Sequence, residues 1–159
     1  MIEISPATRA DVPDIFRLVV ALAEYEKLAH MVVSTEADFE RELFGDGARV
    51  EAVIARCDGV VVGFALYFHN FSTFLGRKGL YLEDLFVLPE FRSQSIGKAL
   101  LKHLAGIALA RNCGRFEWAV LDWNTPSIAF YEAMGASVLP DWRIVRVAGE
   151  KLTFLADNS

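Results

Sequence analysis

Residues 80–135 read LYLEDLFVLPEFRSQSIGKALLKHLAGIALARNCGRFEWAVLDWNTPSIAFYEAMG, and this stretch decides the fold. An apolar strand at Leu80–Leu88 is expected to run through a polar loop, Arg92–Gly97, into an amphipathic helix from about Ser95 to Asn112. A strand, a loop and a helix start in this order present free backbone N–H groups and the positive end of a helix dipole. The stretch therefore predicts a binding site for a phosphorylated molecule.

The elements on either side predict an α/β fold, with a mixed, mostly antiparallel central sheet flanked by helices on both faces. Periodicity, capping residues and turn residues place these elements. Before the quoted stretch we expect a strand at Ile2–Ser5, a helix ending near Leu28, a helix at Glu36–Phe44, a hairpin across 49–70 that turns at Asp58-Gly59, and a turn at Gly76–Gly79. Gly114 is expected to be the C′ residue of the long helix, and a strand at Phe116–Leu121 should follow it. The rest of the chain is expected to form a helix at Thr125–Met134, ended by Gly135, and a hairpin within Trp142–Leu155 around Ala148-Gly149.

Length and composition limit the class of protein. A chain of 159 residues favours a single domain over 1–159, and 53% hydrophobic residues with a mean hydropathy of +0.30 favour a substantial core and an apolar subunit interface. The net charge of −5 gives no support to nucleic-acid binding. The longest apolar run, Val60–Phe68, is too short to span a membrane, and no signal peptide is visible. With only two cysteines, a cytoplasmic location is expected.

Neither the histidines nor the cysteines suggest a catalytic centre. His30, His69 and His103 lack metal-ligand spacing, so no metal is expected. Cys113 falls at the end of a predicted helix, where the dipole disfavours a thiolate, and Cys57 has no neighbouring histidine in the sequence. A covalent route through cysteine is therefore disfavoured.

The quoted stretch resembles the GNAT superfamily of acyl-CoA-dependent N-acetyltransferases. The phosphate motif of that family, Gln/Arg-x-x-Gly-x-Gly/Ala, matches Arg92, Gly97 and their spacing. Ser95 stands where the motif has its first Gly, and Ser93 where close relatives often carry Gly. LYLEDLFV, WNTPSIAFYEAMGAS and AEYEKL more narrowly resemble the spermidine/spermine (diamine) and thialysine acetyltransferase branch.

The resemblance implies acetyl-CoA as cosubstrate, a homodimer and a small cationic amine as acceptor. It implies Tyr131 as general acid, Glu83 as the residue that faces the amine, and acceptor contacts from Tyr25, Glu26, Glu83 and Asp84. The implied acetyl-CoA contacts, besides Tyr131, are Leu85, Phe86, Val87, Arg92, Ser93, Gln94, Ser95, Ile96, Gly97, Lys98, Asn124, Pro126 and Ser127. Ser72-Thr73-Phe74 replaces the Asp-Pro-Trp that polyamine acetyltransferases tend to carry, which leaves a shorter, lysine-like amine open.

These residue types suit transfer of an acetyl group to an amine. A primary amine has a pKa near 10.4, so carboxylates are useful both to attract its cation and to accept its proton. Glu83 and Asp84 are adjacent on a strand, so only one is expected to face the amine directly. A phenol can protonate the departing thiolate, and direct attack in a ternary complex is expected. Two alternatives stay open: a protein or peptide N-acetyltransferase, and a non-catalytic acyl-CoA-binding sensor.

Overall fold

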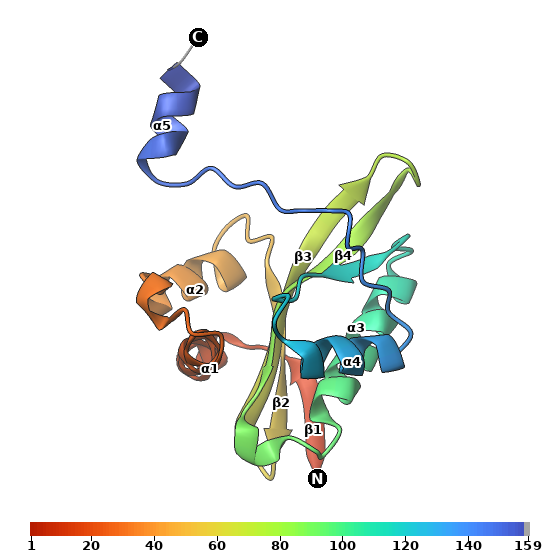
Figure 1. Ribbon diagram of the computed structural model, residues 1–159. Coiled ribbons are helices and arrows are strands. Elements are labelled where there is room, and N and C mark those ends of the chain that lie inside the picture. The colour runs from red at the N-terminus through yellow and green to blue at the C-terminus, as the bar shows by residue number, and fades with distance from the viewer. Residues whose placement is uncertain (158–159) are drawn as a thin grey trace. The chain divides into compact units, whose positions relative to one another are not determined.

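The computed structural model describes residues 1–157 (Figure 1). The chain divides into two compact units, Met1–Ala119 and Val120–Ser159, which are described separately. The prediction of one domain stays a prediction.

The first unit is built on a five-stranded sheet in the order β1-β2-β3-β4-β5. The first four strands pair antiparallel, and β4 and β5 pair parallel, as expected for a mixed, mostly antiparallel sheet. The strands are β1 (Ile2–Pro6), β2 (Glu51–Cys57), β3 (Val60–Ser72), β4 (Arg77–Val87) and β5 (Phe116–Trp118).

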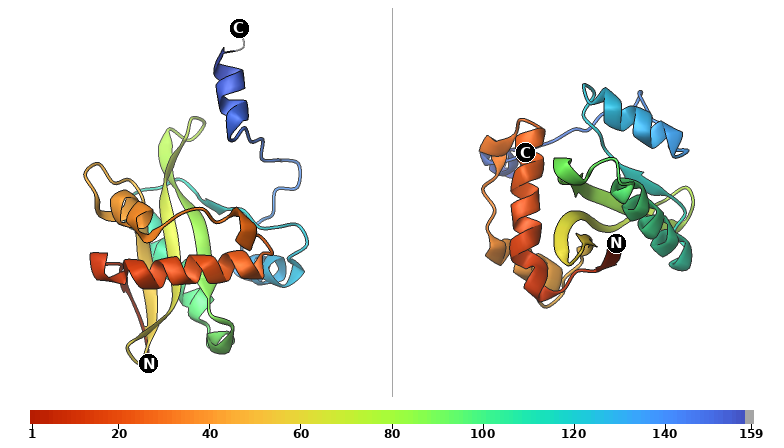
Figure 2. Two further views of the ribbon diagram at one scale, coloured as in Figure 1. Left: turned by 90° about the vertical axis from the view of Figure 1, so that its left-hand side faces the viewer. Right: turned by 90° about the horizontal axis from the view of Figure 1, so that it is seen from below.

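Helices cover both faces of this sheet. Figures 1 and 2 show α1 (Val12–Tyr25) and α2 (Glu36–Phe44) on one side and α3 (Ile96–Ala110) on the other. On α1, Ile15 and Leu18 are fully buried against Phe64 of β3, because their spacing places them on one face of the helix. Burying such side chains contributes about 1.5–3 kcal/mol each. Three short 3₁₀ turns complete the unit: η1 (Arg9–Asp11), η2 (Ala29–Met31) and η3 (Pro89–Phe91).

The predicted turn at Asp58-Gly59 and the predicted helix at Glu36–Phe44 are confirmed. Asp58 and Gly59, with φ of 50° and 85°, form the turn between β2 and β3. The bounds of α2 agree with the prediction, and capping by Thr35 and Asp38 explains where it begins.

The second unit contains α4 (Thr125–Ala133) and α5 (Glu150–Asp157). Gly135 ends α4 with a φ of 96°, as predicted. The predicted hairpin around Ala148-Gly149 is wrong, because no strand occurs in described residues 136–157 and α5 begins directly after Gly149. A two-residue hairpin turn of type I′ needs positive φ at both central residues, whereas only Gly149 has it, at 61°.

Two further turn predictions are wrong. Asn112, with a φ of 57°, is the left-handed residue that ends α3, and Cys113 N–H bonds Ala108 O at 2.9 Å behind it. Gly114 does not have positive φ. Gly79 lies inside β4 rather than in the preceding turn, where Gly76 supplies the positive φ of 66°.

The register of β4 changes at its acidic pair. Asp84 lies opposite Leu66 and Leu82 opposite Tyr67, so Glu83 is an extra residue on β4 and forms a β-bulge. The bulge leaves Glu83 exposed and Asp84 partly buried. No helix in the described part of the chain is long and apolar enough to cross a membrane.

Candidate active site

The second half of β4 has one edge without a partner strand. β5 pairs only with Leu80–Leu82, whereas β3 pairs with β4 as far as Val87. Within the described sheet, Leu85–Val87 therefore lacks a partner strand on the β5 side. An extended ligand arm can bind there as an added strand does, which fits the predicted role of these residues.

The loop after β4 leads into the start of α3 with strained backbone. Ser93 and Ser95 have φ of 69° and 61°, in the left-handed region that glycine adopts without cost. These are the positions where the resemblance leads us to expect Gly. The loop therefore keeps a glycine-type shape although it carries serines, and the two side chains cost roughly 1–2 kcal/mol each in backbone strain.

The start of α3 offers backbone donors to an anion. The first helical bond joins Ala99 N–H to Ser95 O at 3.0 Å, so the N–H groups of Ile96, Gly97 and Lys98 lie ahead of the helical ladder. Ser95 makes no side-chain cap bond, and the first turn contains no acidic residue. Ile96 is buried and anchors the loop, while Gln94 and Lys98 are exposed. This arrangement suits a diphosphate.

Three carboxyl groups lie near the bulge of β4. Burial, together with the charges of Glu83 and Glu26, raises the pKa of Asp84 to about 6. Burial also raises the pKa of Glu26, the residue that caps the C-terminus of α1. The effect of Glu26 on Asp84 shows that the end of α1 and the bulge of β4 bring carboxylates near one another. A bound cation would offset the cost of ionising them.

The side chain of Arg92 lies on aromatic rings. Its guanidinium carbon is 4.7 Å from the ring centroid of Tyr25 and 5.3 Å from that of Phe86, and its Nε–H donates to Val87 O at 3.0 Å. The motif placed Arg92 at the phosphate loop, but no sequence signal indicated its partner on α1.

The other predicted site residues belong to α4 in the second unit. Asn124 caps α4 by accepting a hydrogen bond from Ser127 N–H at 3.4 Å, and Pro126 occupies the first turn. Tyr131 lies further along α4, with its ring centroid 5.5 Å from that of Phe130. Their roles toward acetyl-CoA stay predictions.

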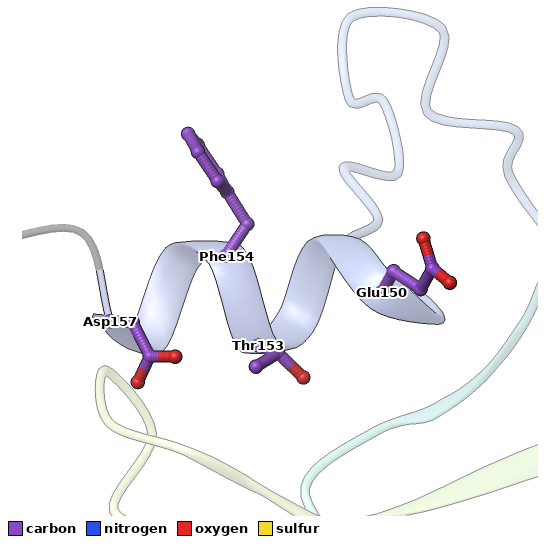
Figure 3. Close-up of a pocket in the computed structure, with 4 residues that line it drawn as sticks. All are labelled: Glu150, Thr153, Phe154 and Asp157. Atoms are coloured by element: carbon purple, nitrogen blue, oxygen red, sulfur yellow. The ribbon is translucent and has the colours of Figure 1, made fainter.

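Among described residues 1–157, no three His, Cys, Asp or Glu side chains gather in a way that could hold a metal ion. The depression in Figure 3 is lined by Glu150, Thr153, Phe154 and Asp157, all from α5. One helix thus supplies all the described residues that line this pocket.

The family model described as acetyltransferase (GNAT) family matches residues 16–136, which include β4, the loop before α3 and α4. The chain belongs to the GNAT family. It is 36% identical to the mouse (Mus musculus) thialysine N-epsilon-acetyltransferase, over 96% of both chains. It is 32% identical to the L-ornithine N5-acetyltransferase of Arabidopsis thaliana, over 92% of this chain and 84% of the relative. Among solved structures, an integron cassette protein of V. cholerae matches with a TM-score of 0.82 and 29% identity, over 99% and 98% of the chains.

Membership of the GNAT family makes this protein an acetyltransferase that transfers acetyl to an amine from acetyl-CoA. The free edge of β4 and the backbone donors at the start of α3 fit that cosubstrate. The recognised family, the N-acetyltransferase activity and the fold class are thereby confirmed.

Proposed function

We propose that this GNAT enzyme acetylates a primary amine of a small cationic substrate, a diamine, polyamine or lysine-like amine, by direct attack in a ternary complex. The observation that carries the proposal is the group of carboxylates at Glu26, Glu83 and Asp84, whose mutual charge and burial favour a cationic ligand. The names of the relatives also support it, since thialysine and ornithine are amino acids with a side-chain amine.

The carboxylates have two tasks. They attract the ammonium ion, and one of them accepts its proton, because only about one amine in a thousand is neutral at pH 7. Glu83 is exposed at the bulge and is proposed to face the amine. Asp84, with a pKa of about 6, has the better-matched basicity to accept the proton, directly or through water.

The amine then attacks the thioester carbonyl, its C–N bond forms and the C–S bond breaks. The electron pair of the C–S bond stays on sulfur, and the phenol of Tyr131 is proposed to protonate that thiolate. Holding both reactants together saves up to about 7–11 kcal/mol of the barrier.

A panel of amines tests the substrate class. Thialysine, ornithine, spermidine and a lysine-containing peptide are each assayed with acetyl-CoA by thiol release. Turnover of the free amino acids or polyamine supports the proposal. Turnover of the peptide alone would favour a protein acetyltransferase, and coenzyme A binding without any turnover would favour a sensor.

A substitution tests the general acid. Tyr131→Phe is expected to lower kcat by about 100-fold or more while KM for the amine changes little. Matched Phe130→Leu on the same helix is expected to keep most of the activity. Equal kcat for wild type and Tyr131→Phe across several pH values would exclude the role.

We further propose a homodimer and a cytoplasmic location. The dimer is supported by apolar side chains that the described tail exposes, among them Trp142, Ile144 and Val145 at 80%, 72% and 92%. Cys57 and Cys113 are free thiols, which suits a reducing compartment. Sedimentation velocity checks the dimer.

A further inference from the structure

We propose that Arg92 is a positioning residue that couples binding of the carrier at the α3 loop to the acceptor-side end of α1. The proposal deepens the proposed function, since it concerns how the two substrate positions of that site communicate. It rests on contacts within the first unit.

The first step is the position of Arg92, which contacts both β4 and α1 from the loop before α3. Its backbone begins the loop that precedes α3, and its Nε–H donates to Val87 O, at the end of the carrier strand, at 3.0 Å. Its guanidinium lies 4.7 Å from the ring centroid of Tyr25, the last residue of α1. One planar cation therefore connects the loop, β4 and α1.

The second step is the packing of Phe86 against both Tyr25 and Arg92. Phe86 of β4 is 5% exposed, and its ring meets that of Tyr25 edge to face, with centroids 6.4 Å apart. The same Phe86 ring lies 5.3 Å from the guanidinium. The three side chains thus form one packed group, in which a shift of the guanidinium moves Tyr25.

The third step joins Tyr25 to the acceptor carboxylates. Glu26 follows Tyr25 directly, and its N–H bonds Leu22 O at 2.9 Å, so its backbone is fixed to the end of α1. The charge of Glu26 acts on Asp84. Holding Tyr25 in place therefore also holds Glu26 in the position from which its charge acts on Asp84.

The fourth step is the response to a carrier. Arg92 is exposed, so the side of its guanidinium away from the rings remains accessible to an anion in the loop. A diphosphate bound by the adjacent backbone N–H groups limits the motion of the loop and strengthens the hold of Arg92 on Tyr25. Such coupling is reciprocal, so an ordered α1 end also favours the carrier.

Hydrogen–deuterium exchange with and without coenzyme A tests the coupling without any amine. In wild-type protein, coenzyme A is expected to slow exchange both in residues 92–99 and in residues 22–28. In Arg92→Gln, which keeps a planar donor but no charge, the slowing is expected in 92–99 only. Arg92→Lys keeps a cation over the ring and should retain part of the effect.

Arg41→Gln is the matched control, because Arg41 is an exposed arginine on α2 that pairs with Asp38 at 3.1 Å. It should behave as wild type. Slowing confined to 92–99 in wild-type protein, or unchanged slowing of 22–28 in Arg92→Gln, would overturn the proposal.

Kinetics supply the second readout. KM for L-ornithine is measured at limiting and at saturating acetyl-CoA, and the ratio of the two values reports the coupling. In Arg92→Gln this ratio should fall by about two- to fivefold, the range expected for loss of one exposed cation–π contact. An Arg92→Gln/Tyr25→Leu double variant should lose no more than either single variant. Additive losses would show that the residues act separately. Failure of every amine to react would refute the proposed function, while the exchange result would still decide the coupling.

Discussion

The pair formed by β4 and α3 has two ends that differ in how their polar groups are satisfied. At the closed end, which comprises residues 77–80 and 111–115 and the side chains of Glu51 and His69 beside them, side chains bond one another. Arg111 makes two hydrogen bonds to Glu51, at 2.6 and 2.9 Å, and a third to His69 Nε2 at 2.9 Å. His69 Nδ1 lies 3.0 Å from Gly79 O, and Arg77 donates to Asn112 Oδ1 at 3.1 Å.

At the binding end, residues 84–87 and 92–98, the chain leaves comparable groups available. The start of α3 has neither a side-chain cap nor an acid in its first turn, and Asp84 has a raised pKa caused mainly by burial. Ser93 and Ser95 add backbone strain. The comparison teaches that ionic hydrogen bonds stabilise the closed end, although Asn70 Oδ1 beside Gly79 is buried there without a hydrogen-bond partner. The binding end keeps unfavourable features that the proposed ligand can relieve.

The largest expected effect comes from giving the binding end an anion of its own. In Ser95→Asp, a carboxylate at the start of α3 can accept the free N–H groups, so the free energy of unfolding should rise by about 1 kcal/mol. The same charge repels a diphosphate, so Kd for coenzyme A should rise at least about tenfold. Calorimetry and thermal unfolding measure the two effects.

Ser95→Asn is the control, because it also caps a helix and tolerates left-handed φ but adds no charge. It should stabilise the protein with a much smaller loss of affinity. An unchanged coenzyme A affinity in Ser95→Asp would place the diphosphate away from α3.

The next effect is a pH dependence from Asp84. Its pKa in the folded protein is about 6, so the carboxylate that is proposed to attract the amine becomes protonated below that pH. Below pH 6, KM for the amine should rise by up to about tenfold per pH unit. Asp84→Asn should have a higher KM at pH 8 and should lack this inflection, as measured by initial rates from pH 5 to 8.

The raised pKa of Asp84 also predicts how the stability of the protein depends on pH. A carboxyl whose pKa is raised by folding binds its proton more tightly in the folded state, so wild-type stability should fall as pH rises from about 4 to 6. Asp84→Asn should therefore be more stable than wild type at pH 7 and lose that advantage at pH 4. Chemical denaturation at both pH values measures this, and a constant difference would contradict it.

A smaller effect is expected at the closed end. Glu51→Gln removes the ionic bonds to Arg111 and should cost about 1 kcal/mol of unfolding free energy at pH 7, since both side chains are partly exposed. Hydrogen bonding by Arg111 lowers the pKa of Glu51. Its contribution is therefore complete above about pH 4.3 and is lost as pH falls through the lower folded pKa.

The affinity of Glu51→Gln for coenzyme A tests whether the closed end and the binding end are independent. Kd should not change in Glu51→Gln, because Glu51 lies at the closed end. Glu42→Gln, an exposed acid 3.8 Å from Arg41, is the control and should affect neither stability nor binding. A tenfold loss of coenzyme A binding in Glu51→Gln would show that the ends are not independent.

Sequence reasoning succeeded at several places where short-range chemistry decides the outcome, but it failed at the end of α3, where Asn112 rather than Gly114 has the left-handed backbone. Asp58-Gly59 fixes a turn and Thr35 with Asp38 fixes the start of α2, and each signal involves neighbours in the chain. The resemblance likewise indicated the loop before α3. In each case a few adjacent residues determine the local backbone conformation.

It failed where distant segments decide. The bulge at Glu83 depends on how β4 pairs with β3, and it changes the regular alternation from which only one of Glu83 and Asp84 was expected to face the amine directly. The contact of Arg92 with Tyr25 depends on packing α1 against β4. A hairpin was predicted within Trp142–Leu155, but a strand needs a partner edge, and none pairs there within the described chain.

The smallest effect concerns the strained serines, and it sharpens the difference between the ends. Ser93→Gly and Ser95→Gly each remove a Cβ from a left-handed residue, which gains about 1–2 kcal/mol, but glycine loses about 0.5–1 kcal/mol through the freer unfolded chain. Each should therefore stabilise by about 0.5–1 kcal/mol.

The control is Ser34→Gly, at a loop residue that does not have positive φ, where only the unfolded-state loss remains and the protein should be less stable. Coenzyme A affinity should be nearly unchanged in both loop variants, because the backbone donors keep their places. If glycine instead weakens coenzyme A binding severalfold without altering stability, the serine hydroxyls themselves bind the carrier, and the strain at this end is offset by direct contacts.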